Sequence, residues 1–303
     1  MSEAISHVER ARRAGVFTQR ARVVENVPEG AYHRIVMTVP EIAEAARPGQ
    51  FVALAVGGET TGALLRRAFS ISGATAPIGP GPGRLELVVA GHGRGSTWIT
   101  RQGPGAELDV VGPLGRPFPL PTTGVPCVLV GGGYGSAPLF WLADALRQRG
   151  CPSALVLGAA TRERLYGVRQ AQQIGASVVL TTDDGSLGVK GWVSDVLGEV
   201  ITKTGAAVVY ACGPMGMLRS VSEIAAERGV VAQVAVEESM ACGVGVCMTC
   251  VMPVVGKDGA TRMTRACVEG PVFRGDRLRW EAFEDGWCRV PADAHGAPGT
   301  GGH

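Results

Sequence analysis

Four cysteines near the C-terminus have a spacing that suits an electron-carrying metal cluster. They follow the pattern C-x4-C-x2-C, with a fourth cysteine after sixteen further residues, and are Cys242, Cys247, Cys250 and Cys267. Four thiolates at this plant-type spacing are the ligand set of a [2Fe–2S] cluster. Gly243 and Gly245 lie in the loop between the first two cysteines, where a chain without side chains can turn its N–H groups toward the cluster sulfurs. The pattern therefore predicts a centre that transfers single electrons.

Three other readings of these cysteines compete with the cluster. A structural zinc site usually pairs its ligands as two short C-x2-C knuckles, whereas three cysteines here share one loop. A disulfide framework belongs to an oxidising compartment, and residues 1–22 carry no apolar core of a signal peptide. The third interpretation is that the cysteines are free buried thiols. We assign it instead to the four cysteines outside the pattern, which are Cys127, Cys151, Cys212 and Cys288. The cysteine usage and the missing signal peptide indicate the cytoplasm.

A glycine-rich turn is the second pattern that could hold a cofactor. Residues 127–130 form a short apolar run, residues 131–135 read G-G-G-Y-G, and residues 139–148 have helical spacing of apolar side chains. Such a strand–turn–helix brings backbone N–H groups close to a phosphate. The sequence predicts a nucleotide phosphate here, with a tight turn that binds nothing as the alternative, because the spacing is not the full G-x-G-x-x-G fingerprint.

Two further segments could contact nucleotides. Residues 66–72 read R-R-A-F-S-I-S and are later joined by G-H-G-R-G-S-T at residues 91–97, so that an arginine, a hydroxyl and glycine N–H groups could hold a pyrophosphate. A basic strand edge followed by a hairpin loop explains the same residues equally well. The segment 210–215, Y-A-C-G-P-M, ends a strand and starts a helix, at the edge of a parallel sheet where ligands bind. Cys212 there either touches a cofactor or is a small packed residue.

The elements that position these segments change in kind along the chain. Residues 1–118 contain short β-branched runs between turns and are predicted to form an antiparallel β domain, a barrel or a sandwich. Residues 119–235 alternate strands (153–157, 177–180, 207–210) with helices (164–173, 193–199, 215–228), which predicts a parallel-sheet α/β domain. Residues 236–290 form the cluster domain, and the Gly/Pro/Ala-rich residues 291–303 are predicted to be a disordered tail.

Composition excludes several functions for the chain. The 303 residues are 46% hydrophobic and 18% charged, as in a folded protein with two or three domains, and no apolar run is long enough for a membrane span. A net charge of +2 gives no reason to expect a nucleic-acid partner. No Ser–His–Asp set and no pair of catalytic carboxylates emerges, so we expect no catalytic side chain and assign the chemistry to cofactors.

The order of these segments resembles the ferredoxin-reductase-like flavoprotein superfamily. Its R-x-[YF]-[ST], G-G-G-x-G-x-x-P and C-G-P-x-x-M motifs are matched by residues 67–70, 131–138 and 212–217. With the cluster segments 238–250 and 266–273, the chain is similar to the electron-transfer subunits of class 1B dihydroorotate dehydrogenases over about residues 16–285. Two departures are an extended hairpin at residues 256–259 and a Ser96-Thr97 pair where Gly-Thr is expected.

The resemblance implies three cofactors and a partner. It implies FAD at Arg67, Ala68, Phe69, Ser70, Gly93, Gly95 and Ser96 of a β-barrel. It implies NAD(H) at Gly132, Gly133, Gly135, Cys212, Gly213 and Pro214, and a [2Fe–2S] cluster at the four cysteines of the loop. The implied partner is an FMN-containing catalytic subunit of pyrimidine biosynthesis, in a heterotetramer with two copies of each chain.

Three alternatives to that function stay open. The small subunits of ferredoxin:NAD(P) oxidoreductase and sulfide-dehydrogenase-type complexes resemble the chain throughout, but they usually carry aspartate at the first ligand position, where this chain has Cys242. A standalone NAD(P)H reductase for an oxygenase would need no permanent partner. A redox-sensing regulator would bind nucleotide without fast flavin reduction. The choice between NADH and NADPH also stays open, because Thr161, Arg162 and Arg164 would tolerate a 2′-phosphate.

Overall fold

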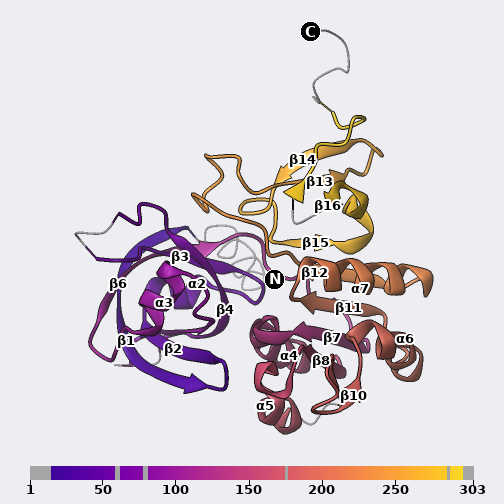
Figure 1. Cartoon of the computed structure of the whole chain (residues 1–303), viewed down its shortest axis with the longest axis horizontal. Helices are drawn as coiled ribbons and strands as arrows, with labels where there is room; N and C mark the ends of the chain where they lie inside the picture. Colours follow the sequence, from indigo (N-terminus) through magenta and orange to yellow (C-terminus); the bar gives the residue numbers. More distant parts are fainter. Residues whose placement is uncertain (1–14, 59–61, 78–80, 175–176, 285–286, 296–303) are drawn as a thin grey trace, which may run out of the picture. The chain divides into compact units, whose positions relative to one another are not determined.

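The computed structural model describes residues 15–58, 62–77, 81–174, 177–284 and 287–295 of the chain. Its internal contacts separate two units, one up to Leu114 and one from Gly115 onward (Figure 1). No helix among the described residues is long and apolar enough to cross a bilayer. The turn residues 78–80 of the first unit, the N-terminal residues 1–14 and the last residues of the predicted tail, 296–303, lie outside this description.

Six antiparallel strands close into a barrel in the first unit, which confirms the antiparallel prediction and selects a barrel over a sandwich. The strands are β1 (Phe17–Glu29), β2 (Tyr32–Thr38), β3 (Phe51–Leu54), β4 (Arg67–Thr75), β5 (Arg84–Val89) and β6 (Glu107–Leu114). They are hydrogen-bonded in the closed order β1-β2-β5-β4-β3-β6. Closure leaves no open sheet edge among the described strands of this unit.

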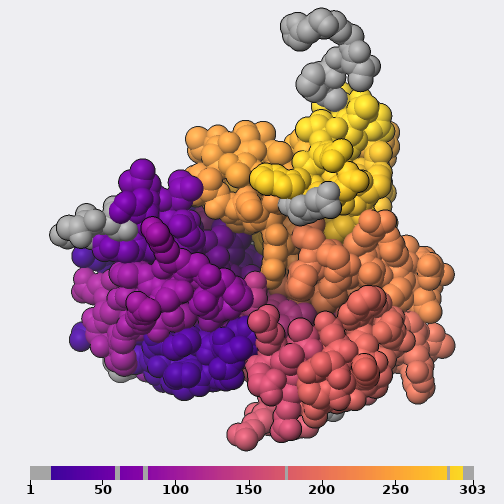
Figure 2. All heavy atoms as spheres, in the orientation of Figure 1, coloured from indigo at the N-terminus to yellow at the C-terminus, as the bar shows by residue number. Residues whose placement is uncertain are grey.

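The interior of the barrel is a packed core. Ile35, Leu54, Ile71 and Leu87 are fully buried inward-facing residues of four different strands. In Figure 1 the short helices α2 (Pro40–Ala45) and α3 (Arg94–Thr100) lie over the ring of strands, and α3 adds the fully buried Ile99 to the core. On the face shown in Figure 2, atoms cover the ring that Figure 1 draws open as ribbons. Side chains that fill a small barrel in this way leave little room inside it, so we expect a ligand to bind on the outside of the barrel.

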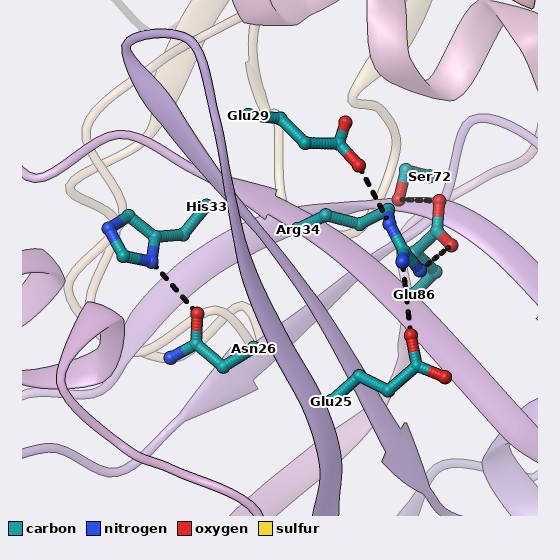
Figure 3. A network of polar contacts seen from close by, with 7 residues as sticks. All are labelled: Glu25, Asn26, Glu29, His33, Arg34, Ser72 and Glu86. Atoms are coloured by element: carbon teal, nitrogen blue, oxygen red, sulfur yellow. Dashed lines mark hydrogen bonds and ion pairs between the residues drawn. The ribbon is translucent and has the colours of Figure 1, made fainter.

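A polar network ties β1, β2 and β5 together on the barrel (Figure 3). The Arg34 guanidinium pairs with Glu25 at 3.0 Å, Glu29 at 2.9 Å and Glu86 at 3.2 Å. In the same view the Asn26 side-chain oxygen and the His33 ring share a hydrogen bond at 2.8 Å. The Asn26 amide also donates to the carbonyls of Thr100 and Gln102, at 2.9 and 2.8 Å. The strand pair thereby holds the C-terminal end of α3.

The second unit contains a seven-stranded sheet in the order β10-β9-β8-β7-β11-β12-β15. Its strands are β7 (Cys127–Gly132), β8 (Ser153–Ala159), β9 (Val178–Thr182), β10 (Val189–Lys190), β11 (Val208–Cys212), β12 (Val231–Ala235) and β15 (Val272–Arg274). All neighbours pair in parallel except β12 and β15, which confirms the predicted parallel α/β sheet. The chain leaves β7 toward one edge and returns to β11 on its other side. The strand order therefore reverses between β7 and β11, and such a reversal is where open α/β sheets bind ligands.

Helices α4 (Ala137–Gln148), α5 (Val168–Gln173), α6 (Val193–Thr204) and α7 (Met215–Glu227) connect these strands. Helices α4 and α7 lie within two residues of the predicted bounds, whereas α5 and α6 differ by more. Helix α5 starts four residues later than predicted, because residues 162–164 form a separate short turn and Gly167 has a left-handed φ of 75°. Helix α6 runs five residues further, to the left-handed Gly205 that caps it. Gly198 lies inside α6, where the Arg228 side chain occupies the space that a methyl group would need, and this contact accounts for a glycine at a helical position.

The cluster segment follows β12 and shares the sheet of the second unit. Strands β13 (Val251–Val255) and β14 (Thr261–Arg265) form a hairpin whose turn includes residues 256–259, which confirms the predicted extended hairpin. Strand β15 then adds to the edge of the seven-stranded sheet, and a small pair, β16 (Phe283–Glu284) and β17 (Trp287–Cys288), follows. Of the predicted tail, residues 291–295 are held on the segment: Asp293 pairs with Arg279 at 3.0 Å and the His295 N–H donates to the Thr261 carbonyl at 2.7 Å.

Candidate iron–sulfur and nucleotide sites

The four predicted cluster cysteines come together as two pairs of thiols. Cys242 and Cys247 are neighbours on the outer side of the loop, where the Cys247 N–H donates to the Cys242 Sγ at 3.4 Å and Cys247 is exposed. Cys250 and Cys267 are the second pair of neighbours and are both buried. Burial together with the neighbouring Cys250 raises the pKa of Cys267 to about 12. The structure thus brings all four predicted ligands into one neighbourhood, an outer and an inner pair.

Backbone N–H groups converge on the first cysteine. The amides of Val244, Val246 and Cys247 donate to the Cys242 Sγ at 3.4, 3.3 and 3.4 Å. The loop can fold back in this way because Gly243 and Gly245 have left-handed φ angles of 71° and 84°. Partial burial acts to raise the pKa of Cys242, but these N–H donors outweigh it and lower that pKa to about 6. A thiolate is therefore favoured at neutral pH, which is the form that binds iron.

Arg265 at the end of β14 fixes the loop from behind. Its guanidinium donates to the Gly245 carbonyl at 3.1 Å and pairs with Glu269 at 2.6 Å. The space next to Gly245 is closed as well, since a methyl group built there would lie 2.5 Å from the Val268 side chain. The loop is held in one shape by a charged clamp and a tight apolar contact.

This donor set suits a two-iron cluster. In the described part of the chain, no three His, Cys, Asp or Glu side chains are already gathered as a metal-binding group. A [2Fe–2S] cluster needs two thiolates on each iron, which two pairs supply, and its sulfurs are stabilised by N–H donors such as those in this loop. A zinc site with four cysteine ligands would need all four sulfurs around one ion.

Of the remaining cysteines, three are buried and one is not. Cys127, Cys151 and Cys212 are at most 2% exposed, as predicted for free thiols. Cys288 is only half-buried, because it lies in the two-residue strand β17 rather than in a core. Burial raises the pKa of Cys127 to about 12 and that of Cys288 to about 11.

The predicted nucleotide turns meet at the switch point of the sheet. Residues 131–135 leave the end of β7, residues 212–214 leave the end of β11, and Cys212 pairs in register with Gly131. A methyl group on Gly135 would lie 2.6 Å from the Cys212 carbonyl, and one on Gly132 would lie 2.8 Å from Pro214. The glycines therefore serve to pack the two turns against each other. Gly133, with φ of 56°, turns the chain into the short helix that precedes α4.

Two residues at this edge were missed from the sequence. The Tyr134 hydroxyl donates to the Glu237 carboxylate at 3.5 Å, although the two are a hundred residues apart. Part of Glu237 faces solvent, yet the protein around its carboxyl displaces enough water to raise its pKa. The two are placed by the glycine turn and by the end of β12. The Cys212 thiol beside them is fully buried, and its contact with a cofactor remains a prediction.

In the barrel, the structure joins the two segments predicted to hold a pyrophosphate. The Arg67 side chain lies over Gly95: a methyl group built on Gly95 would be 2.9 Å from the Arg67 Nε. On β4, Ala68 and Ser70 are exposed and Phe69 is half-buried. The Ser96 hydroxyl accepts from the N–H groups of His92 and Gly93, both at 3.1 Å. Ser96 therefore caps helix α3 and fixes the turn at Gly93.

Comparison with known proteins finds one matching family model and several similar chains. Residues 237–279 match the family model of the iron-sulfur cluster binding domain of dihydroorotate dehydrogenase B. The electron transfer subunit of dihydroorotate dehydrogenase B (NAD(+)) from Desulforamulus reducens is 37% identical over 266 residues, which cover 88% of this chain and 99% of the relative. The corresponding subunit of Geobacillus thermodenitrificans is 38% identical, with 78% and 88% covered.

Solved structures give the same picture of the fold. A chain of the NADH-dependent reduced ferredoxin-NADP oxidoreductase has a TM-score of 0.74 at 30% identity, covering 87% of this chain and 91% of that one. A ferredoxin NADP+ reductase of Neisseria gonorrhoeae, solved with FAD and NADP, has a TM-score of 0.58 at 17% identity, covering 70% and 92%. The second likeness shows the fold alone.

Proposed function

The chain belongs to the family of dihydroorotate dehydrogenase B electron transfer subunits, and from this membership we propose that it carries electrons between an FMN-containing catalytic subunit and NAD. The catalytic partner would oxidise dihydroorotate to orotate in pyrimidine biosynthesis, in a heterotetramer located in the cytoplasm. The observation that supports the proposal most is the cysteine loop, in which two thiol pairs and three N–H donors suit an iron–sulfur cluster.

The cluster ligands in this proposal are the two thiol pairs. Cys242 and Cys247 would hold one iron, and Cys250 and Cys267 the other. Arg265 keeps the loop closed through the Gly245 carbonyl. Exposed apolar side chains on the loop, Val246 among them at 79% exposure, leave the outer iron near the surface, where electrons can be exchanged.

The nucleotide sites are assigned on the paired turns. FAD would be held by Arg67 with Gly93, Gly95 and Ser96, and its ring system would lie along Ala68, Phe69 and Ser70 of β4. NAD would bind at Gly132, Gly133 and Gly135 with Cys212, Gly213 and Pro214, at the switch point. When bound, FAD supplies a two-electron exchange with NAD and a one-electron exchange with the cluster. The domain limits 1–118, 119–235 and 236–290 belong to this same proposal.

Purified protein tests the division of labour. The chain alone, reconstituted with iron, sulfide and FAD, is expected to oxidise NADH with ferricyanide and to form no orotate from dihydroorotate. Addition of the FMN subunit is expected to give NADH formation that depends on dihydroorotate, at a fixed ratio of the two chains. Orotate formed by the single chain would contradict the proposal.

A second function keeps support from one observation. The ferredoxin-NADP oxidoreductase chain has the higher structural likeness of the two described above, at a TM-score of 0.74. A tagged chain isolated from its native cells separates the two functions. A co-eluting subunit of about 300 residues that turns over dihydroorotate supports the first, and a partner of the ferredoxin-oxidoreductase type supports the second.

A further inference from the structure

A charged pair lies beside the buried half of the cysteine segment. The Arg265 guanidinium donates to the two Glu269 carboxylate oxygens at 2.6 and 3.3 Å, and about a third of each side chain is exposed. The backbone joins the same two residues, because the Glu269 N–H donates to the Arg265 carbonyl at 2.9 Å. Side chains and backbone together therefore hold one cation and one anion at a fixed place.

Strand pairing puts this place next to the inner thiols. Arg265 ends β14 and pairs across the hairpin with Val251, the residue that follows Cys250. Cys267 comes two residues after Arg265, and the Ala266 N–H between them donates to the Cys250 carbonyl at 2.8 Å. The arginine therefore belongs to the stretch of backbone that brings the two inner cysteines together.

The guanidinium acts on the inner sulfurs through space and through the loop. Glu269 is the main cause of the raised pKa of Arg265, and the negative charges of the Cys267 and Cys250 thiolates raise that pKa further. The guanidinium also donates to the Gly245 carbonyl at 3.1 Å, and the Gly245 N–H donates to the Cys267 sulfur. One side chain thus brings a positive charge near the inner sulfurs and positions an N–H donor to one of them.

We infer that the Arg265–Glu269 pair sets the reduction potential of the iron–sulfur cluster, with Arg265 favouring the reduced state and Glu269 opposing it. This inference rests on the proposed function, since it takes the cluster to be held by the loop cysteines. Reduction adds one electron, which the flavin supplies, and no bond forms or breaks, so the cluster gains one negative charge. A nearby cation stabilises that charge and a nearby carboxylate destabilises it. Net charge and hydrogen bonds to the sulfurs are what tune such potentials.

The same hairpin offers a matched control pair. Arg262 lies on β14 three residues earlier and pairs with Asp258 at 2.7 Å, again at a spacing of four residues. Its partner across the hairpin is Val254, which is further along the strand from Cys250 than Val251 is. Asp258 is the residue that raises the pKa of Arg262. Variants of this pair lose the same charges at a greater distance from the inner thiols.

The test measures the reduction potential of the reconstituted cluster in the full chain by electron paramagnetic resonance. At a fixed potential, Arg265→Gln should lower the ratio of reduced to oxidised cluster about tenfold, which is a downward shift of about 59 mV for one electron. Glu269→Gln should raise that ratio severalfold. Arg265→Lys keeps the positive charge and should stay close to the unmodified chain. The control variants Arg262→Gln and Asp258→Asn should leave the potential unchanged.

The opposite signs separate charge from loop closure. Arg265→Gln and Glu269→Gln both break the pair, so a role limited to holding the loop would move both potentials the same way or lower the iron content of both without a shift. Either result, or equal potentials in all variants, overturns the inference and leaves the proposed function standing. If Arg265→Gln retains no iron, the other two variants decide: a raised potential in Glu269→Gln with an unchanged one in Arg265→Lys supports the inference, and any other result overturns it. If the unmodified chain assembles no cluster, the inference and the proposed function both fail.

Discussion

The cluster loop should not tolerate a methyl group at Gly245, for two separable reasons. The first is backbone conformation: φ is 84°, and a left-handed angle costs a side-chain-bearing residue about 1–2 kcal/mol. The second is space, because the new methyl carbon would lie 2.5 Å from Val268. Overpacking of this kind costs about 1–3 kcal/mol. Gly245→Ala should therefore destabilise the native loop by about 2–5 kcal/mol.

Gly259 supplies a matched control in the same segment. Its φ is 80°, but nothing lies within 4 Å of a methyl group built there, so Gly259→Ala carries the backbone cost alone. Iron and acid-labile sulfide per chain, with the thermal transition, are the measurements. Gly259→Ala should retain about two irons, whereas Gly245→Ala should be depleted. The excess cost corresponds to about a 5- to 150-fold smaller population of the native loop, or about 1–3 kcal/mol. Val268→Ala added to Gly245→Ala should restore most of the iron. Equal iron content and melting temperature in the two single variants would refute the steric reasoning.

Three further predictions concern the loop, the nucleotide turns and the barrel. In iron-free protein, iodoacetamide should label Cys242 at a rate that rises as the pH passes 6, because the pKa of this thiol is lowered to about 6. Cys267, whose pKa is raised to about 12, should stay unlabelled up to about pH 9. Equal labelling of the two cysteines at neutral pH, measured by mass spectrometry, would contradict the assigned thiolate. Gly135→Ala should raise the Kd for NADH about tenfold or more, because the methyl group displaces the neighbouring turn, whereas Gly216→Ala, with nothing within 4 Å, should leave it unchanged in a fluorescence titration. Arg34→Leu should lower the free energy of unfolding of the barrel in urea by about 1–2 kcal/mol for three half-exposed ion pairs, with a smaller loss at high salt; a loss that salt does not change would point to packing.

The sequence was most informative where the local pattern alone decides the structure. The alternation of apolar runs with helical segments depends on neighbours in the chain, and the parallel sheet that it predicts is confirmed. The cysteine spacing is equally local, and the iron–sulfur segment that it predicts agrees with the family match over residues 237–279. The glycine turn at residues 131–135 was also located correctly, although its glycines are needed for a reason that the sequence did not show. They allow close packing against residues 212–214, a segment distant in sequence.

Features that depend on tertiary contacts were missed. Helix α3 is seven residues long and starts inside a glycine-rich stretch that reads as a loop; it is stabilised by the burial of Ile99 in the barrel and by the Ser96 cap. The pair of Tyr134 and Glu237 joins residues from two turns, and each residue alone carries no signal. A tyrosine within the G-G-G-x-G turn, together with an acidic residue just after the last parallel strand, is the pattern that could have found it.

Strand β15 makes the cluster segment mechanically continuous with the nucleotide sheet. It pairs with β12 through Gln233, Val234 and Ala235, and the Arg116 N–H reaches the Gly270 carbonyl before it. A redox centre on a flexible linker can visit a donor and an acceptor in turn, at distances set by the linker. The cysteine segment is paired into the same sheet as the turns at residues 131–135 and 212–214, so we expect a cluster held there to keep a constant distance from these turns. For the same reason, a chain cut after residue 236 would leave β12 as an unpaired edge, open to pairing with another copy.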